Sequence, residues 1–130
     1  DAAAALIDEV GVASLTTSAV AERSGSSVGV VYRYFPNANV LVLALAERNR
    51  ERFAAELARR LEAGEATDWR SFARTCVASY ETMARSEPGF ATVRFGDVIA
   101  MRLNPKNSRR NDEVGLSLMQ VLVTQFGFPE

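Results

Sequence analysis

The segment AERSGSSVGVVYRYFPN, residues 21–37, gathers side chains that could hold a nucleic acid. Serine and tyrosine hydroxyls hydrogen-bond to phosphate oxygens, and an arginine binds either a phosphate or the edge of a guanine. Gly29 carries no side chain, so the backbone there can approach another molecule closely. Valines and aromatic rings are interleaved with these polar residues, so the segment needs a scaffold that buries one face and exposes the other.

Other kinds of site chemistry have little support. The sequence has no histidine, which excludes imidazole acid–base catalysis, Ser-His-Asp triads and zinc sites that need histidine. We find neither a convergent pair of carboxylates nor a glycine-rich phosphate loop. Cys76 is the single cysteine, cannot form an internal disulfide, and is expected to be a small buried apolar residue. We therefore predict no enzymatic activity, no metal site and no cofactor.

The composition is that of a globular protein. Of the 130 residues, 48% are hydrophobic and 24% are charged, and the formal net charge is −1. A chain this close to neutral is not expected to coat nucleic acid non-specifically, but it can carry a local DNA-binding surface. No apolar run reaches the roughly 20 residues that span a bilayer, and no signal-peptide pattern is present. The predicted location is the cytoplasm, which also fits the lone cysteine.

Helical spacing of apolar residues dominates the sequence, and the strand signal is weak. Three short helices are expected first, at residues 2–10, from Thr16 or Thr17 to Gly25, and from Ser27 to about Tyr34. Longer helices are expected at residues 38–62, from Asp68 to Pro88, at residues 90–103, and from Asn111 or Asp112 to about Phe126. The chain opens inside the first helix, and the last helix carries two apolar stripes. We therefore expect further chain before Asp1 and, after Glu130, further chain or a second subunit.

The three short helices suit a helix-turn-helix, in which two helices joined by a tight turn place one of them on DNA. Ala21 provides the small residue where the two helices approach, Gly25 the turn, and Val31 the buried aliphatic side chain. The outer face of the helix at 27–34 is then exposed, and its N-terminal residues would contact bases. Packing into the core is the alternative role for the tyrosines of this helix.

From Leu15 to Asn37 the sequence LTTSAVAERSGSSVGVVYRYFPN resembles the helix-turn-helix of TetR-family transcriptional regulators. The threonine pair, an alanine, a glycine and Tyr-x-Tyr-Phe occur in the family's order and spacing. The flanking segments AAAALIDEVG and VLVLALAERNRERF are similar to the family's first and fourth helices. The resemblance therefore covers about residues 2–53.

The resemblance implies an all-α bacterial protein with a helix-turn-helix DNA-binding domain at residues 1–45. A long helix would join it to a helical ligand-binding and dimerisation domain at residues 46–130, which would be incomplete. The implied function is a ligand-responsive repressor that binds a palindromic operator in double-stranded DNA as a homodimer. A largely apolar small-molecule effector would release the DNA. The implied DNA contacts are Thr17, Ser18, Ser27, Val28, Gly29, Val30, Tyr32, Arg33 and Tyr34.

Two positions depart from the family pattern. The family usually has a lysine where this chain has Ala38, at the start of the fourth helix, and an aliphatic residue where it has Ser26. Residues 1–35 also carry two arginines against four acidic residues, so counterion release should contribute little to DNA binding. The alternative function is a helical interaction module that keeps the TetR-like fold and binds DNA weakly or without sequence preference.

Apolar residues with helical spacing continue in the second half of the chain. Trp69, Phe72, Cys76, Tyr80 and Met83 recur at steps of three and four, a pattern that is more often core than pocket. Ligand cavities of TetR-like proteins lie among such helices, so the resemblance makes several apolar residues of this region pocket candidates. The candidates are Trp69, Phe72, Tyr80, Met83, Phe95, Val98 and Met101.

Overall fold

The computed structural model describes residues 2–93, 116 and 119–129, and every regular element within these residues is helical. Five helices follow one another along the chain: α1 (Ala2–Val10), α2 (Thr17–Ser24), α3 (Val28–Tyr34), α4 (Ala38–Glu62) and α5 (Trp69–Ser86). Residues 119–126 form one more helical segment near the C-terminus. The predicted all-α class is confirmed, and the boundaries predicted for the first five helices agree closely with those observed.

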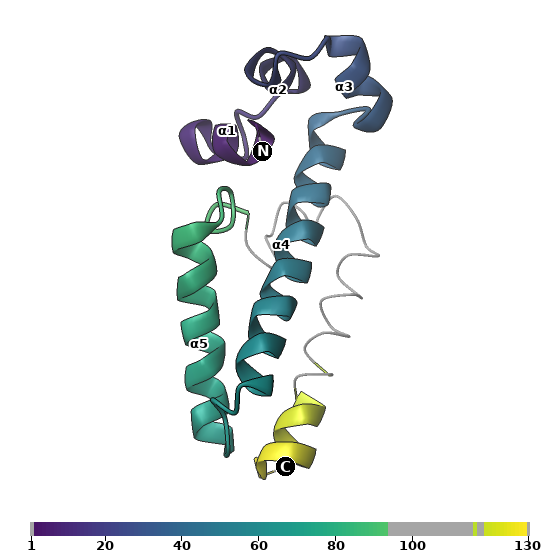
Figure 1. Cartoon of the computed structure of the whole chain (residues 1–130). Helices are drawn as coiled ribbons and strands as arrows, with labels where there is room; N and C mark the ends of the chain where they lie inside the picture. The colour runs from purple at the N-terminus through teal and green to yellow at the C-terminus, as the bar shows by residue number, and fades with distance from the viewer. Residues whose placement is uncertain (1, 94–115, 117–118, 130) are drawn as a thin grey trace.

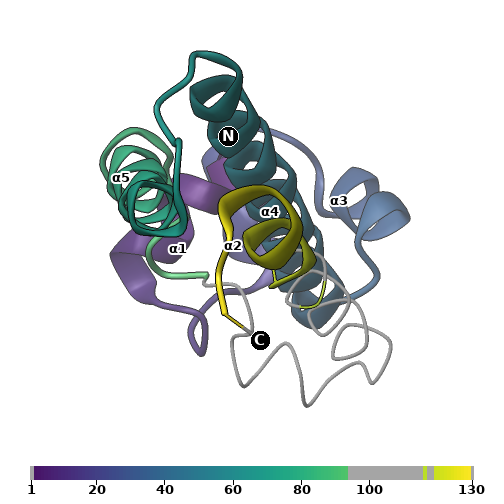
Figure 2. The same ribbon diagram turned by 90° about the horizontal axis from the view of Figure 1, so that it is seen from below.

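Helix α4 connects the first three helices with α5. Figure 1 shows α1, α2 and α3 gathered at the N-terminal end of α4, while α5 runs back alongside the rest of it. In the view from below, α4 lies between α3 and α5 (Figure 2). The segment 119–126 lies near the C-terminal end of α4, and the ring of Phe126 stacks on that of Phe72 in α5 at 4.8 Å.

Polar residues begin four of the five helices. The side chains of Thr16, Ser27, Asn37 and Asp68 each accept a hydrogen bond from the backbone N–H three residues later. Each bond satisfies one of the free N–H groups at a helix start and contributes about 1 kcal/mol of stability. The cap of α2 is thus Thr16, and Thr17 is the first residue of the helix itself.

The first four helices share one apolar core. Ile7, Ala21, Val31 and Leu41 are buried in it, one from each of α1 to α4. Gly25 ends α2 with a φ of 68°, a left-handed conformation that glycine adopts without steric cost, and its N–H bonds back into α2. This core and this turn hold α3 against α2 in the geometry of a helix-turn-helix.

Helices α4 and α5 pack through a surface that is partly polar. Phe72 and Met83 of α5 are buried, as the apolar pattern predicts, but Thr75 and Ser79 between them are buried as well. Each of these two hydroxyls donates to the carbonyl oxygen four residues earlier in α5, at 2.8 Å. The hydroxyls are therefore satisfied within their own helix, and their small size lets α4 approach α5.

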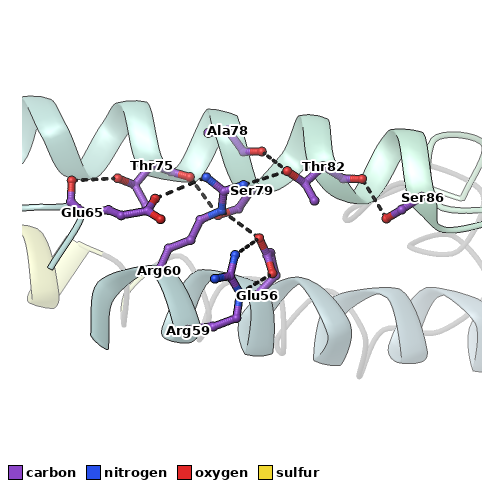
Figure 3. A network of polar contacts seen from close by, with 9 residues as sticks. All are labelled: Glu56, Arg59, Arg60, Glu65, Thr75, Ala78, Ser79, Thr82 and Ser86. Carbon is purple, nitrogen blue, oxygen red and sulfur yellow. Dashed lines mark hydrogen bonds and ion pairs between the residues drawn. The ribbon is translucent and has the colours of Figure 1, made fainter. Parts of the chain in front are cut away.

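A charged network links the C-terminal half of α4 to α5 (Figure 3). Glu56 accepts hydrogen bonds from Arg59 at 2.9 and 3.0 Å and from Arg60 at 2.7 Å. Arg60 also donates to Glu65 and, across the helix interface, to the hydroxyl of Thr82 at 2.8 Å. The hydrogen bonds from Arg59 and Arg60 hold the pKa of the Glu56 carboxyl at about 2, well below its ordinary 4.5.

A turn after α5 is fastened to the first helices. Asn49 is fully buried in α4 and donates its side-chain N–H groups to the carbonyl oxygens of Gly89 and Val93, both at 3.2 Å. Asp8 of α1 accepts hydrogen bonds from the N–H of Gly89 at 2.7 Å and from the hydroxyl of Thr92 at 2.6 Å. Segments far apart in the sequence are thus held together at one turn.

The helix predicted at residues 90–103 needs a correction at its start. Residues 90–93 form turns, in which the N–H of Val93 bonds to the carbonyl oxygen of Gly89 at 2.9 Å. The rest of that predicted helix and the predicted loop at 104–112 lie outside the described residues. Of the last predicted helix, the part at 119–126 is helical in the structure.

Replacing Glu56 with glutamine should lower the melting temperature in a pH-dependent way. Because the pKa of Glu56 is depressed in the folded state, its stabilisation is fully present above pH 4.5 and is lost as the pH falls toward 2. Circular dichroism melts should show a constant difference between wild type and Glu56→Gln near neutral pH, shrinking below pH 4.5. Glu51→Gln, at an exposed position of α4, is the control. A difference that persists unchanged to pH 2 would contradict the ion-pair explanation.

Asn49→Ala removes the two buried side-chain N–H donors, so the carbonyl oxygens of Gly89 and Val93 lose these hydrogen bonds. The free energy of unfolding should fall by roughly 2–4 kcal/mol, from unsatisfied polar groups and a small cavity. Urea unfolding followed by circular dichroism measures the change. Asn39→Ala, at an exposed position of the same helix, should shift stability by less than about 0.5 kcal/mol. Equal shifts for the two variants would show that the turn is not held by Asn49.

Candidate nucleic-acid interface

Helix α3 turns one face to the core and the opposite face to solvent. Val31 is buried in the core of the first four helices. Gly29 and Arg33, two residues before and after it, lie on the opposite side of the helix and are exposed. A Cβ built at Gly29 would have no heavy atom within 4 Å, so packing within the described chain does not require glycine there. The glycine leaves the centre of the outer face open.

Val28 and Tyr32 flank this outer face on one side. They lie one turn apart, and their exposed fractions are 43% and 46%. Ser27 is also exposed, and its hydroxyl accepts the hydrogen bond that caps α3, 3.2 Å from the N–H of Val30. The first turn of α3 therefore presents aliphatic and hydroxyl groups, and the last turn presents an arginine.

Val30 and Tyr34 lie on the other flank of α3, beside a groove. The groove has a volume of about 540 Å³ and lies between α3, α1 and the first half of α4. Ala2 and Ala3 of α1 and Ala44 of α4 are among its walls. The structure thus separates Val30 and Tyr34 from the other predicted contacts on α3.

The start of α2 carries the two remaining predicted contacts. Ser18 is exposed, so its side chain is available to a ligand on this surface. Thr17 is only 4% exposed, so little of its side chain is accessible at this surface. The predicted phosphate contact of the Thr17 hydroxyl stays a prediction. The sequence pattern did not reveal the burial of Thr17, because either of the two adjacent threonines could have been the helix cap.

Arginines near this face are few, and one of them is already paired. Arg23 donates two hydrogen bonds to Glu9 of α1, at 2.6 and 2.9 Å. The hydrogen bond from Arg23 lowers the pKa of the Glu9 carboxyl. Ala38 is the first residue of α4. It stands at the position where the TetR family, which the sequence resembles, usually has a lysine. Positive charge on α3 itself therefore depends on Arg33.

The predicted pocket residues that the structure describes all lie in α5. Three of them pair with a second aromatic ring: Trp69 with Phe128, Phe72 with Phe126, and Tyr80 with Phe90, at 5.2, 4.8 and 5.3 Å between ring centroids. Met83 is buried in the same helix. Phe95, Val98 and Met101 lie outside the described residues. The described side chains therefore form separate aromatic pairs along α5, with Met83 buried in the same helix.

Other site types have little support in the structure. The described residues contain no group of three or more His, Cys, Asp or Glu side chains that could hold a metal ion. Cys76 is half-buried, and burial raises the pKa of its thiol. No single helix of the described chain is long and apolar enough to cross a membrane. Taken together, α3 and α4 are long and apolar enough by length and composition alone, with a bend of 61° between them.

Comparisons with known proteins agree with the helix-turn-helix geometry. Residues 1–45 match the model of bacterial regulatory proteins of the tetR family. A TetR-family transcriptional regulator from Streptomyces coelicolor has a similar structure, with 43% sequence identity and a TM-score of 0.69. The similarity covers 79% of this chain and 60% of that protein, so the chain spans 60% of that regulator's length. The curated proteins contain no match. The geometry of α1–α4 and these similarities support a TetR-family helix-turn-helix in residues 1–45.

Proposed function

We propose that the chain is the DNA-binding end and part of the helical body of a ligand-responsive repressor. The observation that carries this proposal is the presentation of α3, which is anchored by Val31 and leaves Gly29 and Arg33 on an open outer face. A helix presented in this way can enter the major groove and meet base edges with its N-terminal turn. Residues 1–45 would bind DNA, and residues 46–130 would bind the effector and the second subunit.

Six exposed residues of the interface have a role in this arrangement. The hydroxyls of Ser18 and Tyr32 would hydrogen-bond to phosphates, while Arg33 would bind a phosphate or a guanine edge. Gly29 would let the backbone of α3 approach the floor of the major groove. Val30 and Tyr34, beside the groove that α3 forms with α1 and α4, would contact the DNA at the margin of the interface.

The small size of one reading helix supports a homodimer on a palindromic operator. Helix α3 has seven residues, so one copy can contact only a few base pairs. Two copies related by a two-fold axis would contact two half-sites and double the number of contacts. The small number of arginines near α3 supports the same arrangement, because a single copy would gain little affinity from counterion release.

We place the effector in the helical part that contains α5. Trp69, Phe72, Tyr80 and Met83 give this part aromatic and apolar side chains, which suit a largely apolar molecule. Phe95, Val98 and Met101 belong to the same set by sequence. An effector there would act on the DNA-binding end through α4, which is continuous from one part to the other, and no catalytic step is involved.

A helical interaction module with weak DNA binding is the second candidate function. Two observations favour it: Ala38 stands at the start of α4 in place of a lysine, and Arg23 is bound to Glu9. Both reduce the positive charge available near α3 without changing how the helix is held. Such a protein would keep the fold and lose sequence-selective binding.

Selection of DNA from a random pool by the full-length protein, at near-physiological salt, distinguishes the two functions. We expect enrichment of a palindrome whose half-sites are one helical turn, about 10 base pairs, or a small multiple of it apart. The affinity for the selected DNA should also depend only weakly on salt concentration, because the protein neutralises few phosphates. If a folded dimer enriches no sequence, the interaction module is the better description and the operator proposal is abandoned.

Gly29→Ala should separate DNA binding from folding. The added methyl group meets no atom within 4 Å in the protein and alanine is the better helix former, so stability should stay constant or rise by up to about 1 kcal/mol. The same methyl would hold α3 away from the base edges, and operator affinity should fall by about tenfold or more. Thermal melts and fluorescence anisotropy measure the two effects.

The control for this variant is Ala73→Ser, an exposed substitution in α5 far from α3 along the chain. It should change neither operator affinity nor stability appreciably. Unchanged operator affinity in Gly29→Ala would mean that the outer face of α3 does not enter the groove.

A further inference from the structure

The first turn of α3 carries no long polar side chain. Bases are most often distinguished by Arg, Lys, Asn or Gln, whose side chains form paired hydrogen bonds with base edges. In the segment Ser27 to Tyr34, the one residue of these types is Arg33, in the last turn. The N-terminal turn, which reaches deepest into the groove in this class of motif, therefore has to read sequence by other means.

Val28 is the residue of this turn that is placed to make a base contact. The hydroxyl of Ser27 is engaged with the N–H of Val30, and Gly29 has no side chain. Val30 lines the groove beside α1 and α4, whereas Val28 is not among the groove's walls. Val28 is the first residue of α3 and is 43% exposed although it is aliphatic.

We propose that Val28 recognises a thymine in each operator half-site, through contact between its methyl groups and the 5-methyl group of the base. This inference rests on the proposed operator binding and pairs one base of the half-site with one side chain of α3. In the major groove a methyl group marks thymine, and no other unmodified base carries one. Valine has no donor or acceptor for another base edge, and burial of the two apolar surfaces is favourable because it removes them from water.

Gly29 makes the contact reachable. A valine side chain is short, so it touches a base only if the helix itself comes close to the floor of the groove. The absence of a side chain at Gly29 leaves the centre of the outer face open, as the free space around it shows. Tyr32, one turn further along, is long enough to reach the phosphates while Val28 touches a base.

The test is a double substitution, in the protein and in the DNA. The full-length protein is titrated with its selected operator, and each thymine is replaced in turn by deoxyuridine, which removes the 5-methyl group and keeps every hydrogen-bonding group. With the wild type, one thymine in each half-site should show a loss of affinity of about fourfold on this replacement. With Val28→Ala the same replacement should have almost no effect, because the methyl has lost its partner.

Val28→Ala is expected to fold normally, since the side chain is exposed and alanine is a good helix former. Val77→Ala, at an exposed position of α5, is the matched control and should keep the full sensitivity to deoxyuridine. If an operator is selected but no deoxyuridine weakens binding, or if the loss is the same in Val28→Ala, the thymine contact is wrong while the proposed function stands. If no operator is selected at all, the proposed function and the contact fall together.

Discussion

The placement of the helix-turn-helix relative to the rest of the molecule depends on how closely the backbone at Gly89 approaches α1. A Cβ at this position would lie 3.2 Å from the Cα and carbonyl oxygen of Ala4 and from the side chain of Ile7, and φ there is 77°. Both the space and the conformation favour glycine. At the same point Asp8 and Asn49 bond to the turn from α1 and α4, so these helices cannot separate from it without losing hydrogen bonds.

The same turn contributes a side chain to the core that holds α3. Val93 is buried in the cluster that contains Ile7, Val31 and Leu41, although it follows α5 in the sequence. The proposed boundary at residue 45 would therefore divide two functions, while the apolar core extends across it. A shift of α5 would be felt by the core around α1 to α4, because close-packed side chains transmit displacement to their neighbours. In the function that we propose, this packing would be a physical basis for communication between an effector and α3.

Local patterns predicted the helices well, because caps and glycine turns act within a few residues of one another. Ser27, Gly25 and Val31 have the roles that their spacing indicates. Long-range pairs could not be predicted in this way. Asn49 is buried on an otherwise apolar face of α4 because its partners come from a turn forty or more residues later. Likewise, the binding of Arg23 to Glu9 requires the packing of α2 on α1, which no periodicity encodes.

The way in which charge is distributed decides what kind of DNA binding α3 can support. Attraction between arginines and phosphates acts on every sequence alike, so it raises non-specific and specific affinity together. In this chain Arg23 is held by Glu9, and Ala38 adds no charge, which leaves Arg33 as the cation of α3. In the proposed complex with DNA, contacts to base edges would then make up a larger share of the total binding free energy. A regulator of this kind can discriminate well between sequences at modest affinity, because the ratio of specific to non-specific binding depends on the contacts that differ between them.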